Sequence, residues 1–230
     1  MSKLGFHIAK WWMGFLSIHP YWLLYLKSDF YYVLIYHLLR YRRKVVRENL
    51  LRSFPEKDFK AIKTIEKRFY RNLCDLFMEA PKMLRADATG YKGRITFTNL
   101  ELVTQLYEQH KNIFYALPHS GNWEWFGKTI CDLTQHQCLA IYKRVENPVF
   151  EQLMLYMRTY GCNLEMVESN SAFKRLAQLR DSQTAVLMMA DQTSHGLASD
   201  YWTEFLHQDT CWFTGIERIA KKLDYAVVFV

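Results

Sequence analysis

The sequence predicts an α/β fold: a mostly parallel β-sheet with helices on both faces, preceded by a helical N-terminal segment. Three observations lead to this prediction. Half of the 230 residues are apolar, and only 9 are Gly and 5 are Pro, which is typical of a folded chain. From residue 94 onward, short apolar runs alternate with segments of helical period. The length fits one α/β domain with an N-terminal appendage.

The elements are expected in the following order. A helix is indicated over 58–84, where apolar residues recur close to the helical period at Ile62, Ile65, Phe69, Leu73 and Phe77. Strand-like segments follow at 94–97, 113–117, 138–142, 164–167, 184–190 and 225–230. Helix-like segments alternate with them at 100–108, 123–133, 148–160, 172–179 and 211–222. This alternation predicts a parallel sheet, because each crossover places a helix on one face of the sheet.

The N-terminal segment is expected to lie on a membrane surface or to dip into it once. Residues 1–60 hold 11 Lys and Arg against 4 Asp and Glu, whereas residues 61–230 hold 19 of each, so the first quarter carries the whole net charge of +7. The apolar, aromatic-rich runs 11–18 and 21–26 are interrupted before they reach the roughly 20 apolar residues of a spanning helix. A further apolar run follows at 30–39, and no signal-peptide cleavage site is present.

A basic cluster follows these apolar runs and consists of Arg40, Arg42, Arg43, Lys44 and Arg47. Cations beside Trp, Tyr and Leu suit the water–lipid interface, where each would gain about 1 kcal/mol from anionic headgroups. The alternative is a buried helical pair with a solvated basic face. Nucleic-acid binding is not indicated, because no known reader motif accompanies the cluster.

The cysteines indicate a reducing compartment. Their number is odd, and their spacing fits neither a metal site nor a disulfide framework. They are expected to be buried thiols rather than reactive ones. The five are Cys74, Cys131, Cys138, Cys162 and Cys211.

His119 and Glu124 form the main candidate site. They stand five residues apart, between the strand-like run 112–118 and the helix-like run 123–133. His119 is therefore expected at the carboxyl end of a strand, where open α/β sheets bind their ligands. A histidine with an orienting carboxylate can act as a general base toward a hydroxyl nucleophile. The alternative is an ordinary turn with a solvated glutamate.

The spacing alone carries little weight. The composition gives about 0.8 pairs of the form His-x4-acid by chance, and the chain holds two. The second pair, His195 with Asp200, lies in a polar Thr-Ser-His-Gly loop. Because His119 stands at a strand end, the context favours the first pair.

The residues around His119 resemble a family signature. His119-Ser-Gly-Asn-Trp-Glu124 is similar to the His-x-Gly-Asn-Trp-Glu motif of the lipid A biosynthesis acyltransferases, the lauroyl/myristoyl transferase family. Further matches follow in the family's order along nearly the whole chain. They are the basic segment 41–50 with Phe54-Pro-Glu56, then Lys143 with Asn147-Pro148, Arg158 and Gly161, then Asp191-Gln192, and last Phe205 with Thr214-Gly215, Glu217 and Ala220. Each match is weak alone, but their collinearity is specific.

Three features depart from the family pattern. Lys143 stands where the family usually has Arg, so a bidentate grip on phosphate would become a point-charge contact. The tripeptide 205–207, Phe-Leu-His, replaces the usual Phe-Phe-Gly, and the contacts of that loop are expected to differ. The chain ends in the apolar run 225–230, whereas family members usually continue, so a C-terminal truncation is expected.

The resemblance implies an αβα sandwich of the glycerolipid acyltransferase type, with membrane-associated helices over 1–44 and the acyltransferase domain over 45–230. It implies an O-acyltransferase at the cytoplasmic face of an inner membrane. The donor would be an acyl carrier protein thioester or, less favoured, a coenzyme A thioester, and the acceptor a hydroxyl of a lipid A precursor. Alternatives are a lysophospholipid or aminoacyl lipid acceptor, or a non-catalytic membrane-bound relative. No metal or other cofactor is expected beside the thioester.

The expected chemistry assigns a role to each candidate residue. His119 is the general base, and Glu124 holds its tautomer and stabilises the imidazolium. Backbone N–H groups around Gly121–Trp123, at a helix N-terminus, could bind the tetrahedral oxyanion. Asn122 is better suited to capping that helix than to catalysis. Ser120 is not expected to be a nucleophile, because Gly-x-Ser-x-Gly is absent around it.

The remaining candidates would bind the substrates. Lys143, Arg144 and Arg158 could hold a phosphate of the acceptor or of a carrier's phosphopantetheine. Asp191 and Gln192 could bind a polar acceptor, support the site or simply cap a strand. Apolar residues of the helix-like run 148–160, among them Met154, Tyr156 and Met157, are expected in the core rather than along an acyl chain.

Overall fold

The computed structural model describes residues 2–85, 92–192 and 201–230 of the chain. Its contacts divide these residues into two compact units. The first unit consists of residues 2–17, 82–85, 92–192 and 213–230. The second unit consists of residues 18–81 and 201–212. Neither unit is one continuous stretch of the chain.

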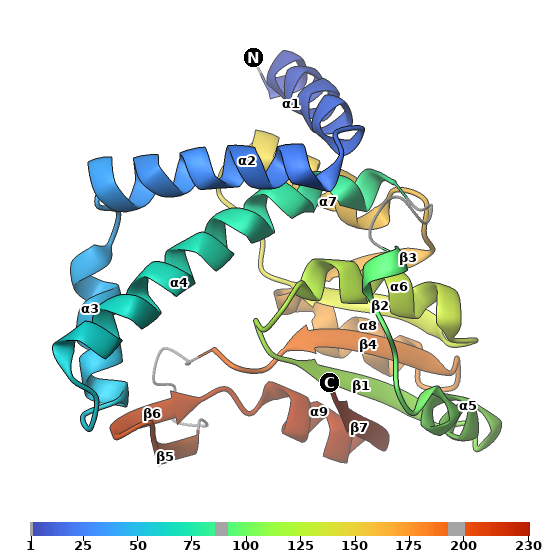
Figure 1. Cartoon of the computed structure of the whole chain (residues 1–230). Helices are drawn as coiled ribbons and strands as arrows, with labels where there is room; N and C mark the ends of the chain where they lie inside the picture. The colour runs from blue at the N-terminus through green and yellow to red at the C-terminus, as the bar shows by residue number, and fades with distance from the viewer. Residues whose placement is uncertain (1, 86–91, 193–200) are drawn as a thin grey trace. The chain divides into compact units, whose positions relative to one another are not determined.

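The first unit is built on a five-stranded sheet in which all neighbouring strands are parallel (Figure 1). Its order is β3-β2-β4-β1-β7, so β4 lies between the two strands that come first in the chain. The strands are β1 (Asn112–Leu117), β2 (Gln137–Tyr142), β3 (Leu164–Glu168), β4 (Thr184–Met189) and β7 (Tyr225–Phe229). The interior strand β1 is buried along its whole length, as its apolar run predicts.

Helices cover both faces of this sheet. On one face, Val103 of α5 (Leu100–Glu108) and Ile130 of α6 (Trp123–Leu133) join a core with Ile113, Tyr115 and Leu117. On the other face, Leu176 of α8 (Ala172–Gln178) and Leu223 of α9 (Gly215–Leu223) pack in a core with Phe114. The β1 side chains alternate between the two cores because successive strand residues point to opposite faces. The predicted parallel sheet flanked by helices is confirmed.

Helix α7 (Pro148–Thr159) is fixed at both ends by local sequence. Asn147 caps its first turn by accepting hydrogen bonds from the N–H groups of Val149 and Phe150, at 3.0 and 3.1 Å, and Pro148 follows at the first helical position. After the helix, Gly161 takes a φ of 70°, a left-handed conformation that suits glycine. These residues of the Asn-Pro…Gly block therefore set the bounds of one helix.

Helix α1 (Ser2–Ser17) packs against α7 within the same unit. Gly5 permits close approach, because a Cβ there would come within 3.3 Å of the Val149 side chain. The rings of Phe6 and Tyr156 meet edge to face at 6.2 Å, and the Lys10 ammonium lies 4.2 Å from the centre of the Tyr156 ring. The face of α1 turned away from these contacts leaves Leu4, Ile8 and Trp11 exposed.

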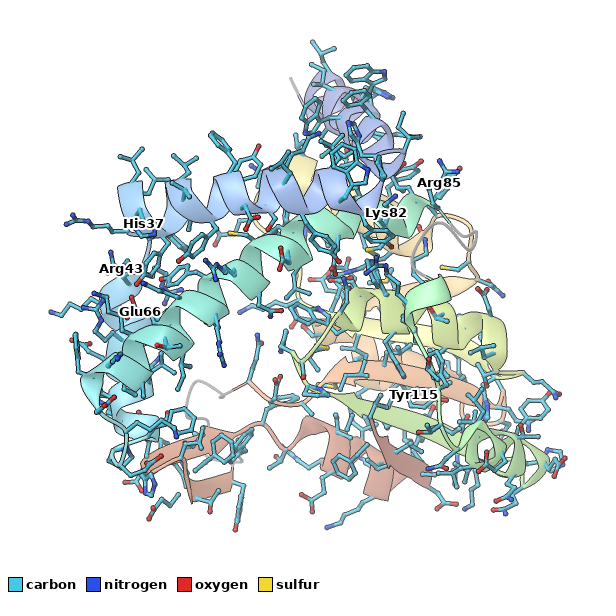
Figure 2. All side chains as sticks on the ribbon, in the orientation of Figure 1. His37, Arg43, Glu66, Lys82, Arg85 and Tyr115 are labelled. Carbon is cyan, nitrogen blue, oxygen red and sulfur yellow. The ribbon has the colours of Figure 1, made fainter. Side chains whose placement is uncertain are left out.

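The second unit is mainly helical. It contains α2 (Tyr21–Tyr32), the π-helical turn Val33–Leu38, α3 (Arg43–Ser53) and α4 (Phe59–Glu79). Between α3 and α4, Glu66 is fully buried and accepts hydrogen bonds from Arg43 at 3.2 Å and from Arg47 at 2.7 and 3.0 Å (Figure 2). Burial alone would raise the pKa of Glu66, but the hydrogen bonds from Arg47 and Arg43 outweigh it and hold that pKa below its usual value. Two cations of the basic cluster therefore serve the packing of two helices.

The second unit also holds a β-hairpin, β5 (Tyr201–Phe205) and β6 (Gln208–Trp212). Its two-residue turn places Leu206 and His207 at φ values of 52° and 58°. The Gln208 side-chain amide donates to the Ser53 hydroxyl at 3.3 Å, which ties the hairpin to the end of α3.

Several boundaries differ from those the sequence predicts. Residues 95–97 form no strand; they follow a short 3-10 turn, Lys92–Arg94. The helix expected over 211–222 begins only at Gly215, because residues before it belong to the hairpin. The helix expected over 58–84 ends at Glu79 and continues as the 3-10 turn Ala80–Leu84. Among the helices that can be described here, none is both long and apolar enough to cross a membrane.

Candidate functional site

The candidate site lies where β1 and β4 end side by side. These strands are parallel neighbours, and Leu117 is the register partner of Met189. The Ala190 N–H continues the ladder by donating to the Leu117 carbonyl at 2.8 Å. His119 and Asp191 each stand two residues beyond this last register pair. The parallel register therefore brings together two side chains that are 72 positions apart in the chain.

The Asp191 carboxylate is hydrogen-bonded to His119 at two points. One oxygen lies 2.6 Å from Nδ1 of the ring, and the other accepts the His119 backbone N–H at 2.6 Å. The Trp123 ring meets the imidazole edge to face, with centroids 4.9 Å apart. Because a carboxylate can only accept, Nδ1 carries the proton and Nε2 keeps its lone pair. The imidazole is therefore held in the tautomer that a general base requires.

Gln192 lies beside the other ring nitrogen of His119. Its side-chain Nε2 is 3.4 Å from the histidine Nε2, so the amide can donate weakly to the ring lone pair. The His119 and Asp191 side chains keep 29% and 37% of their surface exposed, so a substrate can reach them. Asp191 and Gln192 are therefore both in the site, and they contact the histidine itself.

Glu124 is engaged by a different partner. Arg158, in the last turn of α7, donates two hydrogen bonds to its carboxylate, from Nε at 2.9 Å and from Nη2 at 2.5 Å. Burial lowers the pKa of Arg158, but the Glu124 carboxylate raises it more, and the guanidinium stays charged. In the described structure no hydrogen bond joins Glu124 to His119. The carboxylate that contacts the His119 ring is therefore that of Asp191, and Glu124 contacts Arg158.

The turn between His119 and α6 has the expected capping residue. Gly121 takes a φ of 57°, and Asn122 accepts the Trp125 N–H at 3.3 Å. The role of Asn122 as the helix N-cap is confirmed. First-turn N–H groups of a helix lack intrahelical partners, so those of α6 other than the Trp125 N–H, which Asn122 caps, could meet an anion beside His119.

The three cations expected to bind phosphate differ in their contacts: Lys143 and Arg144 follow β2, and Arg158 lies in the last turn of α7. Lys143 and Arg144 are exposed, and within the described part of the chain neither takes part in an ion pair. Arg158 is instead occupied by Glu124. Only Lys143 and Arg144 are therefore placed to meet a phosphate without first breaking a contact. Of the residues expected in the core from the run 148–160, Met157 is buried, whereas Met154 and Tyr156 are half-buried and the Tyr156 ring contacts Phe6 of α1.

Lys128 is a functional candidate that the sequence reasoning missed. It lies on α6 one turn after Glu124, and its side chain is almost fully buried. Its ammonium donates to the carbonyls of Met83, Met157 and Tyr160. The last two belong to the C-terminal end of α7, where carbonyls lack helical partners and favour a cation. Lys128 therefore holds α6 against the end of α7. This contact places Arg158, in the last turn of α7, beside Glu124 on α6.

Other expectations fall elsewhere. His195 and Asp200 lie outside the described residues. Phe205 is in the hairpin of the second unit and stacks edge to face with Trp212 at 5.0 Å. The five cysteines are free thiols: Cys74, Cys138 and Cys211 are buried and the other two half-buried. Burial raises the pKa of the Cys74 and Cys162 thiols, consistent with unreactive groups.

The family model described as bacterial lipid A biosynthesis acyltransferase matches residues 4–230. No curated protein matches the chain at a significant level.

Proposed function

The chain belongs to the bacterial lipid A biosynthesis acyltransferase family, and on this premise we propose that it is an O-acyltransferase acting on a lipid A precursor. It takes a fatty acyl chain from an acyl thioester, carried by acyl carrier protein or, as the less favoured donor, by coenzyme A. The acceptor is a hydroxyl group of the glycolipid. The contact between His119 and Asp191 is the observation that carries the chemical part of this proposal.

In the proposed reaction, Nε2 of His119 takes the proton of the acceptor hydroxyl as its oxygen attacks the thioester carbonyl. The new C–O bond forms a tetrahedral intermediate, and first-turn N–H groups of α6 stabilise its oxyanion. The C–S bond then breaks, and the imidazolium returns its proton to the leaving thiolate. Asp191 accepts the hydrogen bond from Nδ1–H throughout and stabilises the charged ring. Protons and charges balance without any further reactant.

The sequence assigns the orienting role to Glu124, and the contacts support Asp191 for it. Glu124 and Arg158 then act as a pair that sets the position of the first turn of α6 relative to α7. Lys143 and Arg144 supply positive charge at the end of β2, on the same edge of the sheet as His119, and would attract a phosphate of the acceptor or the donor.

A place at the cytoplasmic face of the inner membrane completes the proposal. On α2, the side opposite its buried residues exposes Trp22, Leu26 and Phe30 at helical spacing, and Val33, the first residue of the following π-helical turn, continues this stripe. Such an aromatic, apolar stripe suits the boundary of headgroups and acyl chains. Nearby in sequence, Arg40, Arg42 and Lys44 are exposed and would meet anionic headgroups, whereas Arg43 and Arg47 are held by Glu66.

The test is acyl transfer by His119→Ala, measured with purified enzyme in detergent, an acyl carrier protein thioester and a lipid A precursor, with the product detected by mass spectrometry. Loss of the base should lower kcat by about 10²–10⁴ while the melting temperature is unchanged. His195→Ala is the matched control and should be mild. Near-normal turnover of a folded His119→Ala enzyme would rule out the mechanism, and a larger loss in His195→Ala would transfer it to the other histidine.

A further inference from the structure

The loop that joins β2 to α7 is anchored to a buried acid just after its two cations. Lys143 and Arg144 begin this loop, directly after Tyr142, the last residue of β2. The next residue, Val145, donates its backbone N–H to the Glu151 carboxylate at 2.9 Å. Glu151 stands in the first turn of α7 and is 8% exposed. The anchor of the loop is therefore largely shielded from water.

The same carboxylate also contacts the residue before the cations. Burial and, next, a hydrogen bond from the Tyr142 hydroxyl to Glu151 raise the pKa of Tyr142, and the nearby charge of Arg144 lowers it in part. Lys143 and Arg144 therefore lie between two residues that are both held by Glu151. Their own side chains are exposed.

Glu151 holds the loop without neutralising its charges. Among the ion pairs of the described residues, none joins Glu151 to Lys143 or Arg144. A carboxylate in the first turn of a helix is stabilised by the helix dipole, so Glu151 does not need these two cations as partners. The arrangement fixes the backbone on both sides of the cations and leaves their charges available to an anion.

The loop lies on the same edge of the sheet as the candidate base. Strands β2 and β1 are the two neighbours of β4, and their registers against β4, continued to the strand ends, put Tyr142 level with Leu117. Two strand spacings separate these residues, which is about 10 Å. The cations follow Tyr142, and His119 follows Leu117 two residues later. One substrate molecule can therefore reach His119 and the loop together.

We propose that Glu151 is the positioning residue of a phosphate site, in which it holds Lys143 and Arg144 in place for a phosphate group of the substrate at His119. This inference rests on the proposed function, because the bound phosphate belongs to a substrate of the acyl transfer. A loop that is already ordered binds an anion more tightly, since less conformational entropy is lost on binding. Glu151 therefore acts on substrate affinity and leaves the chemical step to His119.

The test begins with the variant E151A and a phosphorylated lipid A precursor. KM should rise about tenfold while kcat stays within about twofold, as expected when only binding loses a hydrogen bond to a charged group. Removing a negative charge near the site would by itself favour an anionic substrate. A raised KM therefore reports lost positioning of the cations rather than the lost charge.

Two further variants keep this result interpretable if E151A is poorly folded. E151Q retains a side-chain oxygen that can accept the Val145 N–H and should restore most of the affinity. The matched control E146A removes the same charge from an exposed residue of the same loop and should not raise KM. Circular dichroism and the melting temperature check the fold of each variant. A KM that stayed at the wild-type value in folded E151A, or rose as much in E146A, would overturn the proposal.

A double-mutant cycle tests whether Glu151 acts through the cations. K143Q/R144Q should raise KM at least as much as E151A, and adding E151A to it should have no further effect, because the cations that Glu151 positions are already gone. Fully additive effects would show that Glu151 has only a structural role, and so would a loss of kcat in E151A with KM unchanged.

Substrates that lack phosphate identify which molecule the site binds. If the phosphate belongs to the acceptor, E151A should match wild type with a phosphatase-treated precursor. If it belongs to the donor, E151A should raise KM for the carrier-bound or coenzyme A thioester and not for an acyl-N-acetylcysteamine thioester, which has no phosphate. An equal rise in KM for substrates with and without phosphate would overturn the phosphate site.

Binding without turnover separates this proposal from the proposed function. Isothermal titration calorimetry gives the Kd of the phosphorylated precursor for the detergent-solubilised enzyme. If wild type bound this precursor more tightly than E151A did but transferred no acyl chain to it, the proposed function would fail and the phosphate site would stand.

Discussion

The Asp191 carboxylate fixes His119 more firmly than a single hydrogen bond could, because its two oxygens hold the ring and the backbone at once. His119 itself could be predicted from the sequence, since an apolar run precedes it and a helix start follows. Its partner Asp191 could not be predicted, because the order of strands in the sheet determines which carboxylate lies beside His119. Proximity in the sequence favours Glu124 as this partner, but in the structure the Glu124 carboxylate is hydrogen-bonded to Arg158.

The two carboxylates can be separated by Asp191→Asn and Glu124→Gln. Asp191→Asn should lower kcat by roughly 10²–10⁴ with little change in KM or stability, because the amide no longer fixes the tautomer. Glu124→Gln should mainly lower the free energy of unfolding, by about 1–3 kcal/mol, since it removes the partner of a partly buried guanidinium. Steady-state kinetics and urea denaturation measure the two effects. If Glu124→Gln were stable but had a strongly lowered kcat, and Asp191→Asn stayed active, Glu124 rather than Asp191 would be the residue that orients the His119 imidazole.

Helices and strands of the sheet were largely predictable, because each carries its own periodicity and stop signals. Asn147-Pro148 and Gly161 bound α7, and buried apolar runs mark the strands. The hairpin β5–β6 was not predictable, since its turn is Leu206-His207 rather than the Asn-Gly or Asp-Gly that announces such a turn. The basic cluster was visible in the sequence, but its division into exposed cations and the Glu66 contacts depends on tertiary packing.

Replacing Leu206-His207 by Asn-Gly should stabilise the hairpin. Both positions take positive φ, which is costly for a leucine and inexpensive for asparagine and glycine. The free energy of unfolding should rise by about 1 kcal/mol, measured by urea denaturation. Placing Asn-Gly at Thr203-Glu204, within strand β5, is the control and should destabilise the protein. A stability unchanged by the turn replacement would show that the turn conformation differs from the one described.

The two units contain buried titratable groups that respond to acid over different pH ranges. In the first unit, His136 is buried; Nε2 donates to the Lys111 carbonyl at 3.0 Å, and Nδ1 lies 2.8 Å from the Thr134 hydroxyl, which donates to it. Burial lowers the pKa of His136 below its usual value, despite the bond to Lys111. In the second unit, Glu66 also has a lowered pKa, for the opposite reason that its charged form is hydrogen-bonded.

The free energy of unfolding should therefore fall in two stages as the pH is lowered. A group whose pKa is lower when folded binds its proton preferentially in the unfolded chain, so stability is full above the unfolded pKa and falls as pH drops toward the folded one. For His136 the loss begins below about pH 6.5, with a slope of up to about 1.4 kcal/mol per pH unit, and for Glu66 it begins below about pH 4.5.

Urea denaturation from pH 8 to about pH 3 measures this dependence. His136→Gln should lose the first stage and keep the second, and the exposed His110→Asn is the control that should keep both. A wild-type stability that stayed flat between pH 7 and pH 5 would contradict the neutral, buried state of His136.

The position of β4 in the sheet also determines when the site can come into existence. During synthesis β1 and β2 emerge first, yet they do not pair with each other, because β4 takes the place between them. The Asp191 carboxylate that contacts His119 is therefore synthesised 72 residues after it. Contacts so distant in sequence form slowly, because a long loop must close before they are gained. The contact between His119 and Asp191 therefore forms only once β4 has taken its place between β1 and β2, which makes it one of the last features of this sheet to appear as the chain folds.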